Sequence, residues 1–356
     1  MRSREWTTSP ARAAVFAAAL ALASGGGARA QSATNTPGYS INLGGRGWFA
    51  PEIKLQGKPE GKPEGKPDGK IETIETRPQS TTEGQTDGKP QTKPQSKPEG
   101  AQSATSPIAF DFSAGLATDY IYRGTTLSDH KPNVGAAFEA TFAQFYAGVA
   151  VASVKLPTQP AAEITMSAGV RPTIAGIDFD LGAFYYLYPD EQSAGGVQNT
   201  DYWEVGIRAD KRLNALFHLA GELDYSPNIS NSGAWSFYAA AGLGIDVPRR
   251  LLPRDIAVSF TGGAGYSWFG DQSPQLGGFP LPEYLNWQAG VTFSHKTVSL
   301  DLRYYDTNLS REDCFVLTGD LNGRPGGAIN PVTNPAGLTS RWCSATFVAK
   351  LSFGLN

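Results

Sequence analysis

A two-residue alternation of apolar and polar side chains runs through residues 107–356, and it constrains the fold of this chain more than any other feature. In one stretch Ile177, Phe179 and Leu181 alternate with Asp178 and Asp180. Successive side chains of a β-strand point to opposite faces, so this pattern predicts strands with one apolar and one polar face. We predict twelve strands, at 108–123, 133–142, 145–154, 161–171, 177–188, 200–210, 215–225, 234–245, 256–269, 284–293, 298–307 and 341–355. Most of them are long enough to cross a membrane when tilted.

The connections between the predicted strands alternate in length. Residues 124–132 form a long first connection, 143–144 a short second one, and 308–340 the longest, with 246–255 as the exception to the alternation. An up-and-down antiparallel barrel with short periplasmic turns and long outer loops has this pattern, and it places both chain ends on the periplasmic side.

The predicted apolar face carries no Asp, Glu, Lys or Arg, whereas the opposite face is polar, small or charged. Twelve strands also enclose more volume than a soluble barrel normally fills with side chains. Aromatic residues gather toward the long-loop ends of the strands, as in an interface girdle: Tyr120, Tyr122, Tyr185, Tyr225, Trp235, Tyr266, Trp268 and Tyr304. We therefore predict an all-β transmembrane barrel of residues 107–356. The alternative is a secreted β-sandwich with an aromatic core.

Composition excludes two other classes of protein. The mean hydropathy is −0.28 and there is no apolar run of about 20 residues, so the chain is not a bundle of membrane-spanning helices. The net charge is −3, which does not mark the chain as a polyanion binder, and we expect no nucleic-acid partner.

The first 106 residues divide into two segments that differ from the barrel. Residues 1–30 are predicted to be a secretory signal peptide, with Arg2 and Arg4 before a short apolar run and Ala28-Arg29-Ala30 as a small-residue cleavage site. Residues 31–106 contain repeated Lys-Pro-Glu-Gly units, and such a composition buries too little apolar surface to fold. We predict a disordered periplasmic segment, which either tethers the barrel to peptidoglycan or serves as a spacer without a partner.

Five motifs of this chain, in order, resemble the TorF-like family of proteobacterial proteins classed as porins, also called Gcw_chp. They are DYIYRG at 119–124, SDHKP at 128–132, FYAGV at 145–149, YWEV at 202–205 and LDLRYYDT at 300–307. The resemblance covers about 107–356 and implies a barrel in the Gram-negative outer membrane, with no established catalytic residues. The chain departs from the family in the roughly 75 residues between signal and barrel, and in its final residues Phe353-Gly354-Leu355-Asn356, which lack a terminal aromatic.

If the apolar face meets lipid, the polar face lines the lumen. The candidate lumen residues are Arg123, Glu139, Glu163, Arg171, Glu204, Arg208, His218, Glu222, Asp224, Asp301, Arg303 and Lys350. Over the whole polar face, acids outnumber bases by eleven to five, and rings of carboxylates favour cations. The sequence thus predicts passive passage of ions or small polar solutes, with a preference for cations. The alternative is that these groups pair with one another and fill a narrow, closed barrel with a structural or adhesion role.

Enzymatic chemistry has little support in the sequence. A membrane-embedded lipid hydrolase needs a nucleophile beside a base, and the base must be oriented by a third group. The three histidines, His130, His218 and His295, fall in a loop, on the polar face and in a turn, and only His130 has a nearby Ser-Asp pair, at Ser128-Asp129. We predict no enzymatic activity, no cofactor and no metal site.

The two cysteines, Cys314 and Cys343, lie in the longest loop and in the last predicted strand. Because an exported protein meets an oxidising compartment, we predict that they form one disulfide. The intervening segment, 319–340, is then either pinned over the mouth of the barrel as a lid or folded inward as a constriction.

Overall fold

The computed structural model describes residues 108–192 and 199–355. The predicted signal peptide 1–30 and the predicted segment 31–106, with its peptidoglycan contact, lie outside the described residues.

The described residues form β-strands joined by loops that contain short helices. The twelve long strands are β1 (Ile108–Ala117), β4 (Asn133–Phe142), β5 (Phe145–Ala152), β6 (Glu163–Val170), β8 (Ile177–Leu187), β9 (Tyr202–Arg212), β10 (Phe217–Ser226), β11 (Ser236–Asp246), β12 (Ile256–Phe269), β13 (Tyr284–His295), β14 (Val298–Thr307) and β17 (Thr346–Leu355). The short strands are β2 (Ile121–Tyr122), β3 (Thr125–Thr126), β7 (Thr173–Ile174), β15 (Arg324–Pro325) and β16 (Leu338–Thr339). The helices are α2 (Arg311–Thr318) and the 3-10 turns η1 (Ile229–Asn231), η2 (Arg249–Leu251) and η3 (Pro274–Leu276).

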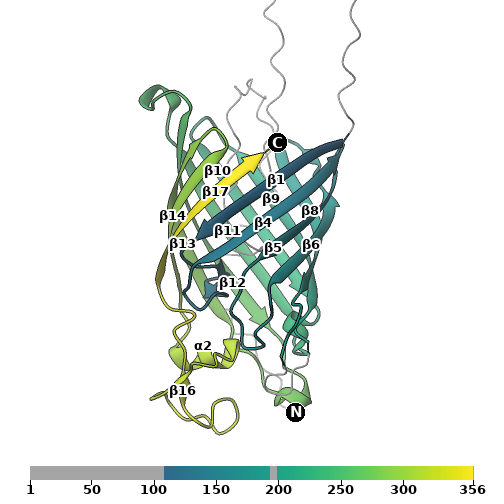
Figure 1. Cartoon of the computed structure of the whole chain (residues 1–356), viewed down its shortest axis with the longest axis vertical. Coiled ribbons are helices and arrows are strands. Elements are labelled where there is room, and N and C mark those ends of the chain that lie inside the picture. Colours follow the sequence, from purple (N-terminus) through teal and green to yellow (C-terminus); the bar gives the residue numbers. More distant parts are fainter. Residues whose placement is uncertain (1–107, 193–198, 356) are drawn as a thin grey trace, which may run out of the picture. The chain divides into compact units, whose positions relative to one another are not determined.

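The long strands form one closed antiparallel sheet (Figure 1). Each pairs with the next long strand along the chain, and β1 pairs with β17 to close the ring, with Phe112 opposite Leu355 and Ala117 opposite Lys350. Closure leaves no unpaired sheet edge, so the backbone polar groups of the strands can be satisfied within the barrel. The predicted twelve-stranded up-and-down barrel is confirmed.

The outer face of the barrel is apolar. Phe347 is 80% exposed, and many other large apolar side chains are exposed on the strands: Phe110, Phe138, Phe145, Met166, Trp203, Ile207, Leu243, Phe260 and Leu302. An exposed apolar surface of this extent is unfavourable in water and matches the apolar band of a membrane barrel. Among residues 108–192 and 199–355, no helix is both long and apolar enough to span a membrane.

The observed strand bounds coincide with the predicted ones at 133–142, 256–269 and 298–307. Two predicted strands extend at least five residues too far at one end. The first ends at Ala117, and Tyr120 and Tyr122 are not part of an outer girdle, because Tyr120 is buried and Tyr122 half-buried in a loop hairpin. The last strand begins at Thr346, so Cys343 lies in the loop before it.

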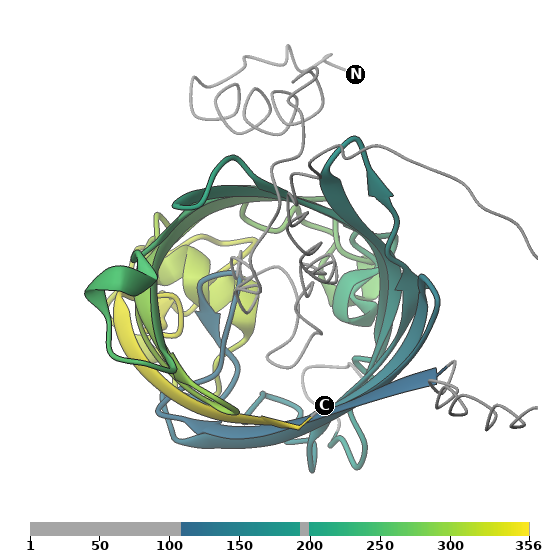
Figure 2. The ribbon, with the colours of Figure 1, turned by 90° about the horizontal axis from the view of Figure 1, so that it is seen from above.

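The two ends of the barrel differ in their connections. We call the end that carries 118–132, 153–162, 188–192, 199–201, 227–235, 270–283 and 308–345 the loop end, and the opposite end the turn end. At the loop end, α2 and β16 lie beyond the ends of the strands (Figure 1). Viewed along the barrel axis, α2 falls inside the outline of the ring (Figure 2). The segment 308–345, which we call the disulfide loop, therefore lies over part of the mouth.

Candidate functional site

The twelve predicted lumen residues lie within the barrel interior or close to it. Nine are buried, namely Arg123, Glu139, Glu163, Glu204, Arg208, His218, Glu222, Asp224 and Arg303, and Arg171, Asp301 and Lys350 are half-buried. Within the strands they stand on the face opposite to the exposed apolar side chains, as Glu204 does between the exposed Trp203 and Val205, so these side chains point inward. The interior of the described barrel is therefore rich in ionisable groups.

The first loop, residues 118–132, folds into the barrel, and we call it the inner loop (Figure 2). It carries the hairpin of β2 and β3, whose turn residues Arg123 and Gly124 both have positive φ, 48° and 82°. Two positive φ angles define the tight hairpin turn that matches strand twist. Glycine is required at 124, because a Cβ there would lie 2.5 Å from Cγ2 of Thr307.

Arg123 joins the inner loop to the opposite wall of the barrel. Its guanidinium donates to both carboxylate oxygens of Glu204 on β9, each at 3.1 Å, and to Asp224 on β10 at 3.3 Å. β10 is six strands from β1 in either direction around the ring, so the inner loop leaves β1 and crosses the interior. The guanidinium also lies 4.7 Å and 4.5 Å from the ring centroids of Tyr122 and Tyr238. We call these five residues the Arg123 cluster.

Aromatic side chains pack against one side of the Arg123 cluster. The rings of Tyr186 and Tyr202 stack with centroids 4.6 Å apart, and Tyr122 meets Tyr186 edge-on at 6.3 Å. The buried carboxylate of Glu163 accepts hydrogen bonds from the hydroxyls of Tyr120, at 2.6 Å, and Tyr188, at 3.0 Å. At this level the side chains of the inner loop contact those of the barrel wall through hydrogen bonds and ring stacking.

A second charged cluster lies on the wall formed by β4, β5, β6 and β8. Arg171 donates to both carboxylate oxygens of Glu139, at 2.5 and 2.8 Å, and to Asp180 at 3.2 Å. Its guanidinium stacks 3.8 Å from the ring centroid of Tyr146, whose hydroxyl donates to Asp180. Glu139, Tyr146 and Asp180 lie on β4, β5 and β8, and Arg171 directly follows β6, so these contacts tie four neighbouring strands together.

The remaining predicted residues pair along the other strands. Arg303 donates to Asp301 at 3.0 and 2.7 Å, to Thr261 at 2.8 Å, and to Gln288. Lys350 stands directly opposite Asp301 in the register of β14 and β17.

On the facing wall Arg208 donates to Asp210 at 2.9 Å, and Glu222 stands opposite Arg208 in register. Near the turn end, Nδ1 of the buried His218 is 3.8 Å from Asp246, a carboxylate that also binds Arg212. The interior therefore carries ion pairs from the loop end to the turn end.

Ser128 and His130 of the inner loop belong to a hydrogen-bond network centred on Asp119, and this network is not a catalytic triad. The carboxylate of Asp119 accepts hydrogen bonds from the hydroxyls of Ser128, at 2.8 Å, and Thr126, at 2.5 Å, and lies 2.8 Å from Nδ1 of His130. Ser128 and His130 thus both bond Asp119 instead of each other, whereas hydrolytic catalysis needs the nucleophile on the imidazole. Nε2 of His130 faces the carbonyl oxygen of Arg341 at 3.0 Å.

Two acceptors on the two ring nitrogens favour the doubly protonated imidazole of His130. The hydrogen bond to Asp119 raises the pKa of His130 above its usual value, against the opposing effect of partial burial. The protonated ring therefore stabilises the loop contact fully below the ordinary histidine pKa of about 6.5. This contribution is lost as pH rises through the raised pKa.

We expect an NMR titration of the ring of His130 in detergent to give a pKa above 6.5, with Asp119→Asn moving it down. The chain has only three histidines, so loss of one resonance in His130→Asn identifies the signal. A pKa for His130 at or below the ordinary value would contradict this placement of its two hydrogen bonds.

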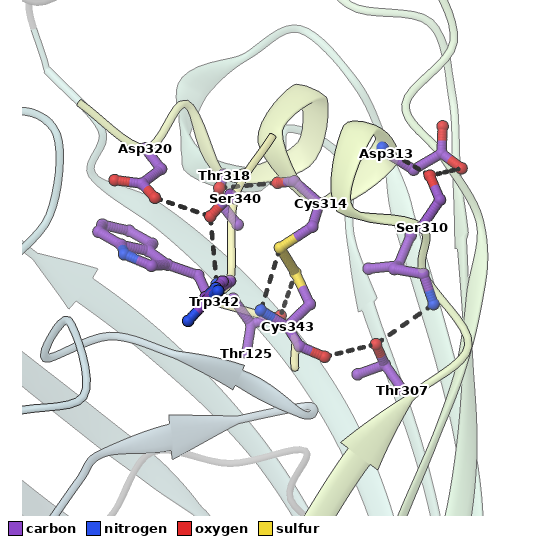
Figure 3. Close-up of a disulfide and its surroundings, with 12 residues drawn as sticks. Thr125, Thr307, Ser310, Asp313, Cys314, Thr318, Asp320, Ser340, Trp342 and Cys343 are labelled. Carbon is purple, nitrogen blue, oxygen red and sulfur yellow. Dashed lines mark hydrogen bonds between the residues drawn. A yellow bond between two sulfur atoms is a disulfide. The ribbon is translucent and has the colours of Figure 1, made fainter. Parts of the chain in front are cut away.

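The disulfide loop holds the inner loop from outside. Cys314 on α2 is bonded to Cys343, as predicted (Figure 3). The amide of Thr126 donates to the carbonyl oxygen of Trp342 at 2.9 Å, and Nε1 of Trp342 donates to Asp129 at 3.1 Å. Of the two predicted positions of the long loop, the one over the mouth fits the structure, and the segment that folds into the barrel is the inner loop instead.

Sequence reasoning found Arg123 as an interior residue but missed the hairpin that carries it. The signal was the Arg-Gly pair between short runs of aromatic and β-branched residues, 120–122 and 125–126. Within residues 108–192 and 199–355, no group of three or more His, Cys, Asp or Glu side chains is arranged to hold a metal ion.

Comparison with known proteins gives a family and several distant structures. The sequence profile of a family described as "Bacterial protein of unknown function (Gcw_chp)" matches residues 101–320. That description contains neither the TorF-like name nor the word porin, so both stay predictions. No curated protein sequence matches the chain.

Three solved structures illustrate the likeness in fold. The NanC porin is 7% identical, with 69% of this chain and 100% of that chain covered and a TM-score of 0.38. The KdgM porin in complex with disordered oligogalacturonate is 7% identical, with 69% of this chain and 99% of that chain covered and a TM-score of 0.36. LpxR from Salmonella typhimurium is 9% identical, with 68% of this chain and 99% of that chain covered and a TM-score of 0.34. At such low identities and scores, what the chain does has to be argued from its own residues.

Proposed function

Since this chain belongs to the Gcw_chp family of bacterial proteins, whose function its description leaves open, we propose from its own residues that it is a porin-like barrel of the Gram-negative outer membrane. In this proposal it allows passive passage of ions or small polar solutes, and its path is narrowed at the loop end by the inner loop. The long loops face outward and the chain ends face the periplasm, as in bacterial barrels with long outer loops.

The observation that carries the proposal is the contrast between the two faces of the barrel. Large apolar side chains cover the outside, whereas guanidinium and carboxylate groups line the inside from the loop end to the turn end. Ionisable residues inside a membrane-spanning structure are expensive to keep and mark a path for polar solutes. A barrel that served only as an anchor could fill its interior with apolar side chains.

We further propose that the path prefers cations. On the predicted interior face acids outnumber bases, and each of Arg123 and Arg171 is matched by two carboxylates. A surplus of negative charge along a narrow path raises the local concentration of cations and repels anions.

The test is a planar lipid bilayer recording on the full chain after removal of the predicted signal. We expect discrete conductance steps and, under a KCl gradient, a reversal potential that favours K⁺ over Cl⁻. Glu163→Gln removes an interior charge and keeps the side-chain shape, so it should weaken the preference for cations. The matched control is Asp255→Asn, which changes an exposed residue between η2 and β12 and should leave selectivity unchanged.

Two results would contradict the proposal. Clear anion selectivity would overturn the preference for cations. An absence of conductance steps, both in the wild type and after loosening of the inner loop by Arg123→Gln, would favour the alternative of a closed structural or adhesion barrel. The buried Arg123 cluster is the observation on which that alternative rests. A separate pull-down tests the proposed tether. If the full chain is retained on peptidoglycan and a chain without 31–106 is not, the segment 31–106 binds peptidoglycan whether the barrel conducts or is closed.

A further inference from the structure

A pocket of about 420 Å³ opens at the loop end, between the inner loop and the disulfide loop. It is lined by His130, Arg311, Arg341, Ser344, Ala345 and Thr346, and by no carboxylate. Its volume falls in the range typical of sites for small molecules.

The two arginines of the pocket are available for a ligand. Both Arg311 and Arg341 are exposed, and no hydrogen bond or ion pair joins either guanidinium to another residue within 108–192 and 199–355. They contrast with the interior arginines, each of which binds at least one carboxylate. Exposed arginines are common, but two of them on one pocket form a concentrated positive charge.

The disulfide brings these two arginines together. Arg311 opens α2 three residues before Cys314, and Arg341 lies two residues before Cys343, so the Cys314–Cys343 bond aligns the two segments. The amide of Ser340 also donates to the carbonyl oxygen of Arg311 at 2.9 Å. The pocket is thus built from a covalently fixed loop, and the charges are held in place before a ligand arrives.

His130 also lines the pocket, and the nearby acids are occupied by donors of their own. Nδ1 of His130 is bound to Asp119, and Asp119 also receives two hydroxyls of the inner loop. Asp313 accepts from Ser310, and Glu312 accepts from the amide of Ala328. Asp129, which precedes His130, accepts from Lys131 and Trp342. All four carboxylates therefore have hydrogen-bond donors of their own, and Glu312 also interacts with the charge of the neighbouring Arg311.

We propose that this pocket binds a phosphate monoester group, carried either by a small solute or by a lipid headgroup. Two guanidinium groups match the charge and the fork geometry of phosphate oxygens, and Ser344 and Thr346 add hydroxyl donors to the lining. The pocket is larger than a phosphate ion, so the rest of the molecule has room within it. The site is separate from the barrel interior and does not depend on whether the barrel conducts.

The test titrates two probes into the full chain folded in a neutral detergent: inorganic phosphate, and short-chain phosphatidic acid. We expect saturable binding of at least one probe by calorimetry. The double variant Arg311→Gln/Arg341→Gln should weaken it about tenfold or more, since each charge-assisted hydrogen bond contributes strongly. Neither substitution removes a side-chain hydrogen bond or ion pair of the described residues, and the heat-modifiable gel shift of the barrel checks folding.

Two further double variants test whether binding depends on these two arginines and on their charge. Arg249→Gln/Arg250→Gln removes two exposed arginines of η2 at the turn end and should bind like the wild type. Arg311→Lys/Arg341→Lys keeps the charge and should restore part of the affinity. An effect of Arg311→Gln/Arg341→Gln on phosphatidic acid alone identifies a lipid headgroup, and an effect on inorganic phosphate as well identifies a soluble phosphate. No saturable binding of either probe, or equal binding by wild type and Arg311→Gln/Arg341→Gln, would overturn the proposal.

Discussion

Replacing Arg123 with glutamine should lower the free energy of unfolding of the barrel by about 3–5 kcal/mol, the range for breaking one partner out of a buried ion pair. Arg123, Glu204 and Asp224 are all almost completely buried, so water cannot replace the lost guanidinium. Two carboxylates would then share a buried site without the charge that holds them together. The loss of cation–π contacts with Tyr122 and Tyr238 acts in the same direction.

Urea unfolding followed by circular dichroism measures this change, with Arg250→Gln as the control. Arg250 is exposed at the turn end, and its replacement should change stability by no more than about 0.5 kcal/mol. The triple variant Arg123→Gln/Glu204→Gln/Asp224→Asn removes the charges together and should recover much of the loss, because no unbalanced charge remains buried. If Arg123→Gln unfolds like Arg250→Gln, the Arg123 cluster does not hold the inner loop.

The same substitution bears on the path through the barrel. The inner loop reaches the opposite wall through Arg123 and through Tyr122, whose hydroxyl donates to Glu204 at 3.0 Å. Without the guanidinium the hairpin should move away from that wall, and single-channel conductance in the bilayer should rise. Lower conductance in Arg123→Gln would place the constriction elsewhere in the barrel.

The strands of this barrel could be predicted from sequence because one physical pattern defines them. Where one face meets lipid and the other the interior, every second side chain is apolar, as in 256–269 and 298–307, and the ends of the pattern mark the ends of the strand. The closure of β1 on β17 follows from the even number of strands and the alternating loop lengths.

The inner loop was harder to predict because alternation also occurs outside the sheet. Tyr120, Ile121 and Tyr122 continue the period of β1, yet the carboxylate of Asp119 gathers hydroxyls and an imidazole from the following residues and turns the chain inward. The contact that fixes the turned segment joins residues 81 apart in sequence, Arg123 and Glu204. A local pattern contains no information about such a partner, so the sequence identified the charge of Arg123 but not its place in a hairpin.

Removing the disulfide should have the second large effect on this protein. The Cys314–Cys343 bond closes a loop with a sequence separation of 29, for which loss of chain entropy in the unfolded state predicts about 3–4 kcal/mol of stabilisation. We expect Cys314→Ser/Cys343→Ser, or the wild type with a reducing agent, to unfold at correspondingly lower urea concentration. The reducing agent should have no effect on Cys314→Ser/Cys343→Ser, because the chain has no other cysteine.

The consequence should reach beyond the disulfide loop, because the inner loop depends on it for contacts. The amide of Thr126 donates to the carbonyl oxygen of Trp342. The hydroxyl of Thr307 on β14 donates to the carbonyl oxygen of Cys343 (Figure 3). Without the disulfide, limited proteolysis should cleave within 319–340 faster, and hydrogen exchange should quicken at the amide of Thr126. Faster cleavage without any change at Thr126 would show that Arg123 holds the inner loop without help from the disulfide loop. A change at both sites would show that the covalent bond outside the mouth also fixes the constriction within it.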